Sequence, residues 1–337
     1  MKRILSFLLA LALSLSLCAC AAPGEKADDG KLQIVTTLFP YYDFARAIAQ
    51  DRADVTLLLS PGREAHSFEP TPLDAVTISE ADVFLYNGGE GEYWVESMLD
   101  AAGEHIAVAS RMMDYVDALN EEYVEGMQGA DGHDHDHEHG SHDDHDHDHD
   151  HEEDEHDSDE VEYDEHIWTS PKNAVVLCRT VCDAICRADA ENAAFYRANC
   201  ENYCAQLEDL DARFAALCES APRRLLIFAD RFPMLYFCRE YGLDYRAAFH
   251  GCSGDTEPSL ATIKFLIDKV EDENIPVVYT IDFGTKKVAA VVSECTGAAI
   301  ETLYSMQTVS RADFDAGETY LTLMERNFEA LRKGLNA

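Results

Sequence analysis

Positively charged side chains are scarce in this chain of 337 residues. It contains 26 Lys and Arg residues against 65 Asp and Glu residues, and its formal net charge is −39. Proteins that bind nucleic acid neutralise phosphates with Lys and Arg. We therefore expect no nucleic-acid partner, whereas cations are natural partners for so acidic a surface.

Long apolar segments are lacking except at the start of the chain. Lys2 and Arg3 precede an apolar segment, residues 4–17, that is too short to span a bilayer as a stable helix. Small residues and Cys20 follow it. This order is typical of a secretory signal peptide, which we place at residues 1–20.

The end of this signal resembles a bacterial lipobox. The sequence Leu17-Cys18-Ala19-Cys20 predicts cleavage before Cys20, which would then carry lipid, and Cys18 is the alternative acceptor. Residues 21–31 are small and polar, as a tether should be. We predict an extracytoplasmic protein that is held at the bacterial cell membrane by a lipid anchor only.

Motifs of catalysis are also absent. The chain has no HExxH, no G-x-S-x-G and no phosphate-binding loop, and His151 and His156 do not have metalloprotease spacing. A catalytic zinc needs an open coordination position and a base. We therefore predict that the chain is not an enzyme.

A disulfide pattern is missing although the chain has eleven cysteines. No C-x-x-C pair occurs, and the nine cysteines outside the signal are an odd number. Cys178, Cys182 and Cys186 are spaced at i, i+4 and i+8, and Cys200 and Cys204 at i and i+4. This spacing indicates buried helix stripes in which cysteine acts as a small apolar residue. A three-cysteine metal site is the alternative, and most of the thiols are expected to be free.

Histidine and acid are concentrated in residues 131–165. This tract holds ten of the fourteen histidines and nineteen of the carboxylates, without Lys or Arg. Imidazole and carboxylate are ligands for divalent cations, and the tract has almost no apolar side chains to bury. We predict a disordered metal-binding loop over residues 128–163. Its weak auxiliary ligands would be His133, His135, His137, His139, His142, His145, His147, His149, His151 and His156.

The rest of the chain alternates strand and helix patterns. Residues 32–36, 55–59 and 83–86 read as continuous apolar strands, with helices at 41–50 and 71–80. Such alternation predicts parallel sheets covered on both faces, with ligands at the carboxyl ends of the strands.

The second half repeats this pattern after a long helix. Ser170-Pro171 is a helix start, and residues 192–218 form a helical pattern about 40 Å long that Pro222 ends. Further strands are expected at 225–228, 277–281 and 299–303, with a last helix at 320–335.

The predicted fold class is α/β, with two lobes joined by one long rigid helix. Each lobe is a mainly parallel sheet flanked by helices. The expected boundaries are 32–190 for the N-terminal lobe, 191–220 for the linking helix and 221–337 for the C-terminal lobe.

Several segments then resemble a known family, the zinc/manganese substrate-binding lipoproteins of ABC importers. The similarity runs over residues 32–336. It rests on residues 36–40 (TTLFP), 61–72 (PGREAHSFEPTP), 166–174 (HIWTSPKNA), 257–259 (EPS) and 320–327 (YLTLMERN).

The resemblance implies that two lobes clasp one divalent ion and that the long helix limits their hinge motion. A His-rich loop is typical of the zinc-binding branch. The expected function is to capture Zn²⁺ and deliver it, as a monomer, to an ABC permease and its ATPase. The alternatives are a Mn²⁺-binding protein of the same family, or a surface zinc buffer or adhesin.

Two of the family's four metal ligands have clear counterparts in this sequence, and two are less certain in position or residue type. His66 matches the first ligand and His166 the second. The third is usually His or Glu, and here Asp230 is the nearest residue able to ligate, with a register uncertain by one or two positions. Asp282 fits the fourth ligand. Zn²⁺ outcompetes Mn²⁺ at such a mixed site by affinity.

Asp230 and Asp282 each have an alternative role. Asp230 could pair with Arg231 or Arg239, and Asp282 could be a helix N-cap before residues 284–286. The remaining histidines outside the tract are His105 and His250. His250, in a Gly-flanked loop, and Glu257 are reserve ligands, although Glu257 also suits a helix cap.

Overall fold

The computed structural model describes residues 30–65, 67–103, 106–128, 162–253 and 257–336. From Leu32 onward the chain forms one compact unit. The predicted signal peptide with Cys18 and Cys20, the ligand His66, and the ten tract histidines lie outside the described residues.

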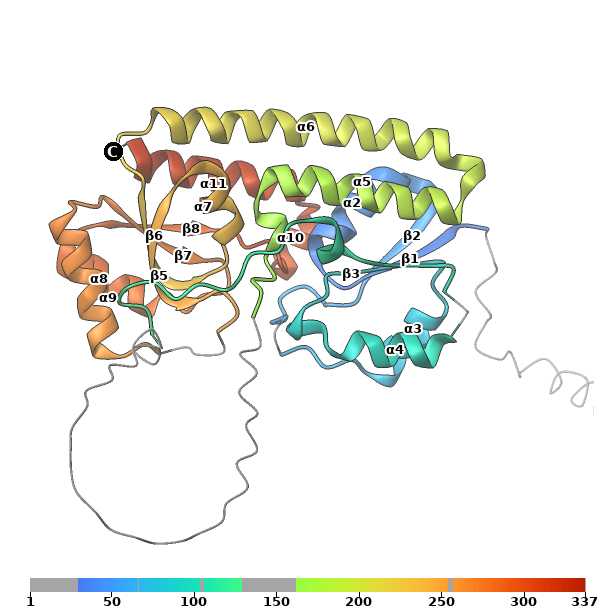
Figure 1. Ribbon diagram of the computed structural model, residues 1–337, viewed down its shortest axis with the longest axis horizontal. Helices are drawn as coiled ribbons and strands as arrows, with labels where there is room; N and C mark the ends of the chain where they lie inside the picture. The colour runs from blue at the N-terminus through green and yellow to red at the C-terminus, as the bar shows by residue number, and fades with distance from the viewer. Residues whose placement is uncertain (1–29, 66, 104–105, 129–161, 254–256, 337) are drawn as a thin grey trace, which may run out of the picture. The chain divides into compact units, whose positions relative to one another are not determined.

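The first sheet contains four parallel strands. They are β1 (Leu32–Thr36), β2 (Ala53–Leu57), β3 (Val83–Tyr86) and β4 (Val108–Arg111), in the order β2-β1-β3-β4. The flanking helices are α2 (Phe39–Ala49), α3 (Pro72–Ser79), α4 (Trp94–Ala102) and α5 (Pro171–Ala188). Figure 1 shows α2 and α5 on one face of this sheet and α3 and α4 on the other, so both faces are covered, as a parallel sheet requires.

The second sheet repeats the strand order of the first. Its strands are β5 (Leu225–Phe232), β6 (Asp244–His250), β7 (Val277–Ile281) and β8 (Ala299–Leu303), parallel and in the order β6-β5-β7-β8. Its helices are α7 (Leu235–Tyr241), α8 (Leu260–Asp272), α9 (Lys287–Thr296), α10 (Arg311–Ala316) and α11 (Tyr320–Asn336). The predicted strands at 277–281 and 299–303 agree with β7 and β8 at both ends.

One long helix, α6 (Ala193–Ser220), runs along both lobes (Figure 1). Its 28 residues span about 42 Å. Arg213 of α6 pairs with Glu325 of α11, while the other half of α6 packs along α5. No helix in the described part of the chain is both long enough and apolar enough to cross a membrane. The predicted fold class, two parallel α/β lobes joined by a long helix, is confirmed.

A single hydrophobic core passes through both lobes on the side of α6. It includes Phe44 under the first sheet, Phe214 of α6 and Phe228 of the second sheet, all fully buried. A smaller, separate core lies between the second sheet and helices α8 and α9, around Leu266 and Val278. Because the lobes share the larger core, a rigid separation of the two would expose apolar surface, at about 25 cal/mol for each Å².

The residues just before the tract pack against the second lobe. The backbone N–H of Leu119 donates to the Tyr236 hydroxyl at 3.0 Å, and that of Gln128 donates to the carbonyl of Ala248 at 2.9 Å. Asn120 forms an antiparallel bridge with Tyr163, so the two flanks of the tract meet. Residues 119–128 therefore touch the C-terminal lobe although the proposed N-terminal domain extends to 190. These domain boundaries stay a prediction.

Candidate metal centre

A cleft lies between the carboxyl ends of the two sets of strands. Its empty space is about 320 Å³ when the part open to solvent is included, and room for water-sized molecules is only about 20 Å³. Glu64, from the loop after β2, and His166 border it on one side, and residues that follow strands of the second sheet border it on the other, among them Gly251, Ile281 and Ser305. This is the place where parallel sheets present ligand-binding groups.

His166 is the buried imidazole of this cleft. Only 1% of its surface is exposed. Its Nδ1 lies 3.2 Å from Oδ1 of Asp164, and its backbone N–H donates to the same oxygen at 2.8 Å. A carboxylate that accepts from one ring nitrogen fixes the tautomer and leaves the other nitrogen to coordinate a metal. Asp164 thus orients the His166 ring from its Nδ1 side, as the carboxylate partner of a metal-binding histidine does.

The segment that carries His166 is bonded to both lobes. On one side Glu165 accepts a hydrogen bond from the backbone N–H of Gly91 at 2.8 Å. On the other, the Tyr236 hydroxyl donates to the carbonyl of Asp164 at 2.8 Å. A short 3-10 turn (Ile167–Thr169) then leads into α5, whose N-cap Ser170 accepts from the backbone N–H of Asn173. His166 is therefore placed by well-anchored backbone on each side.

The surroundings of His166 are electrostatically negative. Burial alone would lower the pKa of the ring, but the carboxylates of Asp164, Glu121 and Glu165 outweigh burial and raise the pKa above its usual value of 6.5. The carboxylates that favour an imidazolium here would equally favour a divalent cation.

Glu121 and Cys252 are neighbours of His166 that the sequence did not single out. Glu121 Oε1 accepts from the backbone N–H of Gly251 at 2.7 Å and lies 3.0 Å from Nδ1 of His250. Burial together with the charges of Glu121, Asp164 and Glu165 raises the pKa of the Cys252 thiol. A bound cation would reverse that effect and favour the thiolate.

Glycine at position 251 permits this arrangement. A Cβ there would lie 3.1 Å from two ring atoms of His166 and 2.9 Å from the carbonyl of Phe232. His250 just before it is the last residue of β6 rather than part of a loop. A His at the end of a strand followed by Gly and Cys was the only local sequence signal for this group, and it gave no indication of Glu121.

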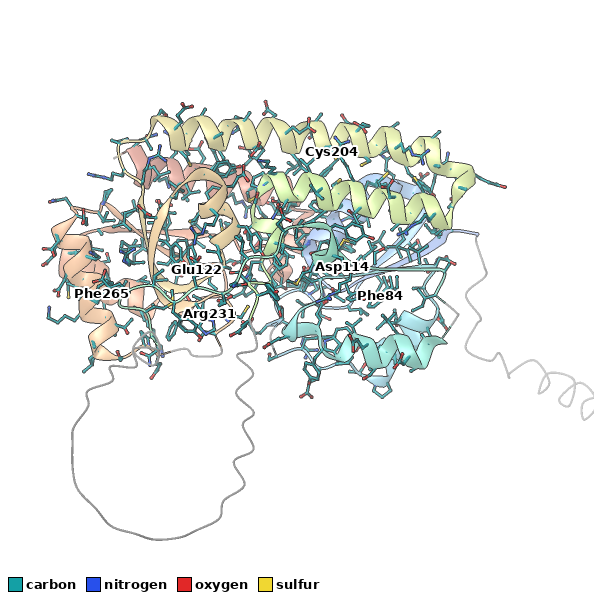
Figure 2. All side chains as sticks on the ribbon, viewed as in Figure 1. Phe84, Asp114, Glu122, Cys204, Arg231 and Phe265 are labelled. Carbon is teal, nitrogen blue, oxygen red and sulfur yellow. The ribbon has the colours of Figure 1, made fainter. Side chains whose placement is uncertain are left out.

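Asp230 does not face the cleft, whereas its neighbour Arg231 does. Oδ2 of Asp230 accepts from the Thr280 hydroxyl at 2.8 Å and from the backbone N–H of Ile281 at 3.3 Å. Arg231 borders the cleft and pairs with Glu64 across the lobes, with 2.9 Å between Nη2 and Oε2. Figure 2 labels Arg231 among the side chains of the second lobe. The pairing of β5 with β6 is irregular between Phe228 and Arg231, so the simple alternation of strand side chains does not decide which of these two neighbours faces the cleft.

The salt-bridge alternative for Asp230 is wrong. The two guanidinium groups considered for it bind other carboxylates, since Arg231 pairs with Glu64 and Arg239 pairs with Glu122.

Asp282 is half-buried and lines a neighbouring pocket with Phe283 and Lys286 rather than the cleft itself. Its Oδ1 accepts from the backbone N–H of Ser305 at 3.2 Å. Burial raises the pKa of Asp282 to about 7. The helix-cap alternative is wrong, because α9 begins at Lys287 with Lys286 at its N-cap. A carboxyl group that is ionised only reluctantly gains from a nearby cation.

The reserve ligand Glu257 stands away from this group. Its exposed carboxylate lies 3.5 Å from Nζ of Lys287. The helix-cap reading of Glu257 is also wrong, because Ser259 caps α8 by accepting from the backbone N–H of Thr262.

The described residues do not show the four predicted ligands gathered around one point. In the described ranges, no set of three His, Cys, Asp or Glu ligand atoms within 4.8 Å of one another contains His166, Asp230 or Asp282. His66 lies outside those ranges, between Ala65 and Ser67 on the loop that also carries Glu64. Convergence of His66, His166, Asp230 and Asp282 on one ion therefore stays a prediction.

Two parallel-sheet lobes whose strand ends border one polar cleft define a two-lobed ligand-binding protein. Residues 34–334 match the family described as zinc-uptake complex component A, periplasmic, and the chain belongs to this family. Membership agrees with the prediction of a binding protein rather than an enzyme.

Relatives of known name support the same assignment. The chain is 32% identical over 308 residues to the high-affinity zinc uptake system protein ZnuA of Bacillus subtilis, a match that covers 90% of this chain and 88% of that protein. It is 30% identical over 316 residues to the zinc-binding lipoprotein AdcA of Streptococcus pneumoniae, covering 93% of this chain and 58% of AdcA.

Solved structures are similar over nearly the whole described chain. The metal-dependent lipoprotein YcdH of Bacillus subtilis matches with a TM-score of 0.71 and 29% identity, covering 91% of this chain and 100% of that one. The Zn(II)-bound ZnuA-like domain of Streptococcus pneumoniae AdcA matches with a TM-score of 0.70 and 26% identity, again covering 91% and 100%.

Proposed function

We propose that this protein captures Zn²⁺ outside the cytoplasm and delivers it to the permease of an ABC importer, which its ATPase drives. Its place in a family of zinc-uptake components supports this role, as do relatives named for zinc uptake and zinc binding. The predicted signal and Cys20 support attachment to the membrane by lipid, with the protein acting as a monomer.

The observation that carries the proposal is the buried pair of His166 and Asp164. An imidazole held by a carboxylate, inside a negative cleft between two lobes, is the arrangement of a metal ligand with its supporting partner. The resemblance assigns His66 as the second imidazole. His66 follows Glu64 by two positions in the sequence, and Glu64 borders the cleft.

The ligands from the second lobe are proposed with unequal support. Asp282 is supported by its hydrogen bond to Ser305, which borders the cleft, and by its raised pKa. Asp230 would first have to leave Thr280 and turn toward the position that Arg231 occupies. Glu121 and Cys252 compete for the same role, since they already lie beside His166.

Zinc is the proposed ion and manganese the alternative. Two imidazoles suit Zn²⁺, and Zn²⁺ precedes Mn²⁺ in the general affinity order. The tract between Gln128 and Glu162 would act as a reservoir of weaker sites, since its flanks at Glu121 and Asp164 adjoin the cleft.

A competition titration tests the proposal. The purified mature protein is mixed with equal Zn²⁺ and Mn²⁺ and a chelator of known affinity, and the tightly held metal is counted. We expect one tight zinc per chain. A tight site that keeps manganese in the presence of stoichiometric zinc would reverse the choice of metal, and the absence of any tight site would refute the proposal.

A further inference from the structure

Four buried cysteines meet between α5 and α6, and none of them lines the cleft. Cys178 and Cys182 lie one turn apart on α5, and Cys200 and Cys204 lie one turn apart on α6. All four side chains are buried, and α5 packs along α6. Figure 2 labels Cys204 where the two helices run together. The two pairs share the i, i+4 spacing that places both thiols of a pair on one helix face.

The sulfur atoms converge at distances that suit a metal. The Sγ atoms of Cys178, Cys200 and Cys204 all lie within 4.8 Å of one another. The Sγ atoms of Cys200 and Cys204 are 3.8 Å apart. Tetrahedral bonds of about 2.3 Å from zinc to sulfur place neighbouring sulfurs about 3.8 Å from each other. Cys182 also interacts with Cys200, so a fourth thiol is within reach.

Packing alone does not account for this convergence. Cys218, also on α6, is equally buried, yet it belongs to no such group in the described part of the chain. Within the cluster, the Cys200 thiol has long contacts, 3.8 Å to the carbonyl of Cys178 and 3.8 Å to Sγ of Cys204. Thiols are weak hydrogen-bond donors, so exchanging such contacts for bonds to a metal loses little.

The charge of a metal thiolate would be partly balanced here. A divalent ion carries one net negative charge with three thiolates and two with a fourth thiolate from Cys182. Arg179 follows Cys178 on α5, and its guanidinium interacts with Cys204. The same guanidinium lies 3.3 Å from Glu201 and 3.2 Å from Glu208, which hold it over α6.

We propose that Cys178, Cys200 and Cys204, with Cys182 as the fourth ligand, form a buried site for one thiophilic d¹⁰ cation such as Zn²⁺, distinct from the cleft. The ion would clamp α5 to α6. Since the ligands are buried, it would enter while the chain folds, and its binding free energy would add to that of folding. Such an ion is a resident structural metal rather than the transported one.

Cadmium is the probe that separates this site from histidine and carboxylate sites. The full mature chain is refolded under reducing, anaerobic conditions with Cd²⁺, and weakly bound metal is removed with a chelator. Cadmium bound by thiolates absorbs in the ultraviolet by charge transfer from sulfur, whereas imidazole and carboxylate complexes do not. We expect one equivalent of retained cadmium with this absorption.

Two variants test whether the cadmium absorption comes from the cysteine cluster between α5 and α6. Cys200→Ala removes the central thiol and should abolish the absorption. The matched control Cys218→Ala removes a buried cysteine of the same helix outside the cluster and should keep it. A signal unchanged in Cys200→Ala, or absent from the wild-type protein, would overturn the proposal. A signal lost in Cys252→Ser but kept in Cys200→Ala would assign the thiolate metal to the cleft instead.

A second measurement serves if Cys200→Ala does not fold. Cadmium NMR of the loaded wild-type protein distinguishes a sulfur-only shell from one that contains nitrogen or oxygen. A resonance in the range of three or four sulfur ligands supports the site, and its absence refutes it. A disulfide between α5 and α6, found by mass spectrometry of the protein as isolated, would likewise refute it.

Discussion

The two lobes have the same strand order but place different chemistry at equivalent strand ends. The central strand β1 is followed by Thr37, a neutral residue, whereas the end of its counterpart β5 carries Asp230 and Arg231. The next strand along the sheet, β3, leads to Asn87, and its counterpart β7 leads to Asp282. Topology therefore decides where a strand end lies, and the residue at that end decides what it can bind.

The two sides of the cleft also differ in which of their polar side chains already bind another side chain. On the first-lobe side, His166 is oriented by Asp164, with 3.2 Å between Nδ1 and Oδ1. On the second-lobe side, Arg231 pairs with Glu64 and Asp230 is held by Thr280. The first side is thus a preorganised half-site, while the second must exchange internal contacts for an ion. The predictions below test this asymmetry.

The largest effect is expected on the preorganised side. Replacing His166 or His66 by Ala should weaken the tight zinc site by more than about 100-fold, because loss of a supporting partner alone costs 10–100-fold. Chelator competition measures the affinity, and circular dichroism checks the fold. Glu257→Gln, an exposed carboxylate away from the cleft, is the control. Unchanged affinity in both histidine variants would place the site elsewhere.

On the second-lobe side we expect smaller and unequal losses. Asp282→Asn should weaken zinc binding by roughly 10-fold or more, the range found when metal-site partners are removed. Asp230→Asn should cost less, because its carboxylate is bonded to Thr280. The same titration on Glu121→Gln and Cys252→Ser completes the comparison. If those two lose more affinity than Asp282→Asn, the second-lobe ligands are the neighbours of His166 and not the predicted carboxylates.

Arg231 should oppose the ion. Removing its positive charge in Arg231→Gln should tighten zinc binding by up to about tenfold, equivalent to ~1.4 kcal/mol. Glu64→Gln, which leaves the guanidinium without this partner, should weaken binding instead. Salt dependence of the chelator competition provides the check, since the charge effect shrinks at high ionic strength. Weaker binding in Arg231→Gln would mean that the Arg231–Glu64 pair holds the lobes in the binding geometry.

The tract should not affect the tight site. Deleting residues 131–159 is expected to remove several weak sites, which calorimetry counts as a fall in stoichiometry at neutral pH. Protons compete with metal for imidazole, so weak binding by the full chain should be lost as the pH falls through about 6.5. If stoichiometry does not fall on deletion, the tract is a solvated spacer.

Much of the fold could be predicted because its signals are local. Strands β7 and β8 are short runs bounded by turn residues, and their limits were predicted at both ends. Ser170-Pro171 marked the start of α5 because an N-cap hydroxyl and a first-turn proline act within one turn. By contrast β4 and β6 carry mixed polar and apolar residues, and no prediction placed them. Sheet pairing alone identifies them as strands.

The site could be predicted only in part, because several of its contacts join residues that are far apart in the sequence. The histidine segments were recognisable as motifs, but the direction of a side chain at a strand end depends on a register of one residue. Asp230 and Arg231 differ by that one step, and the structure turns Arg231 toward the cleft. Glu121 lies 129 residues before His250, and no local pattern joins them.

The sequence by itself determined the acidic character, the alternating α/β pattern, the long helix and the helical spacing of the cysteines. These properties depend on composition and on contacts within a few residues. Only the tertiary structure decided that Arg231 faces His166, that Glu121 joins His250, and that Cys178 meets Cys200 and Cys204. Each of these contacts joins side chains from different elements, and their distances follow from how strands and helices pack, which no local pattern encodes.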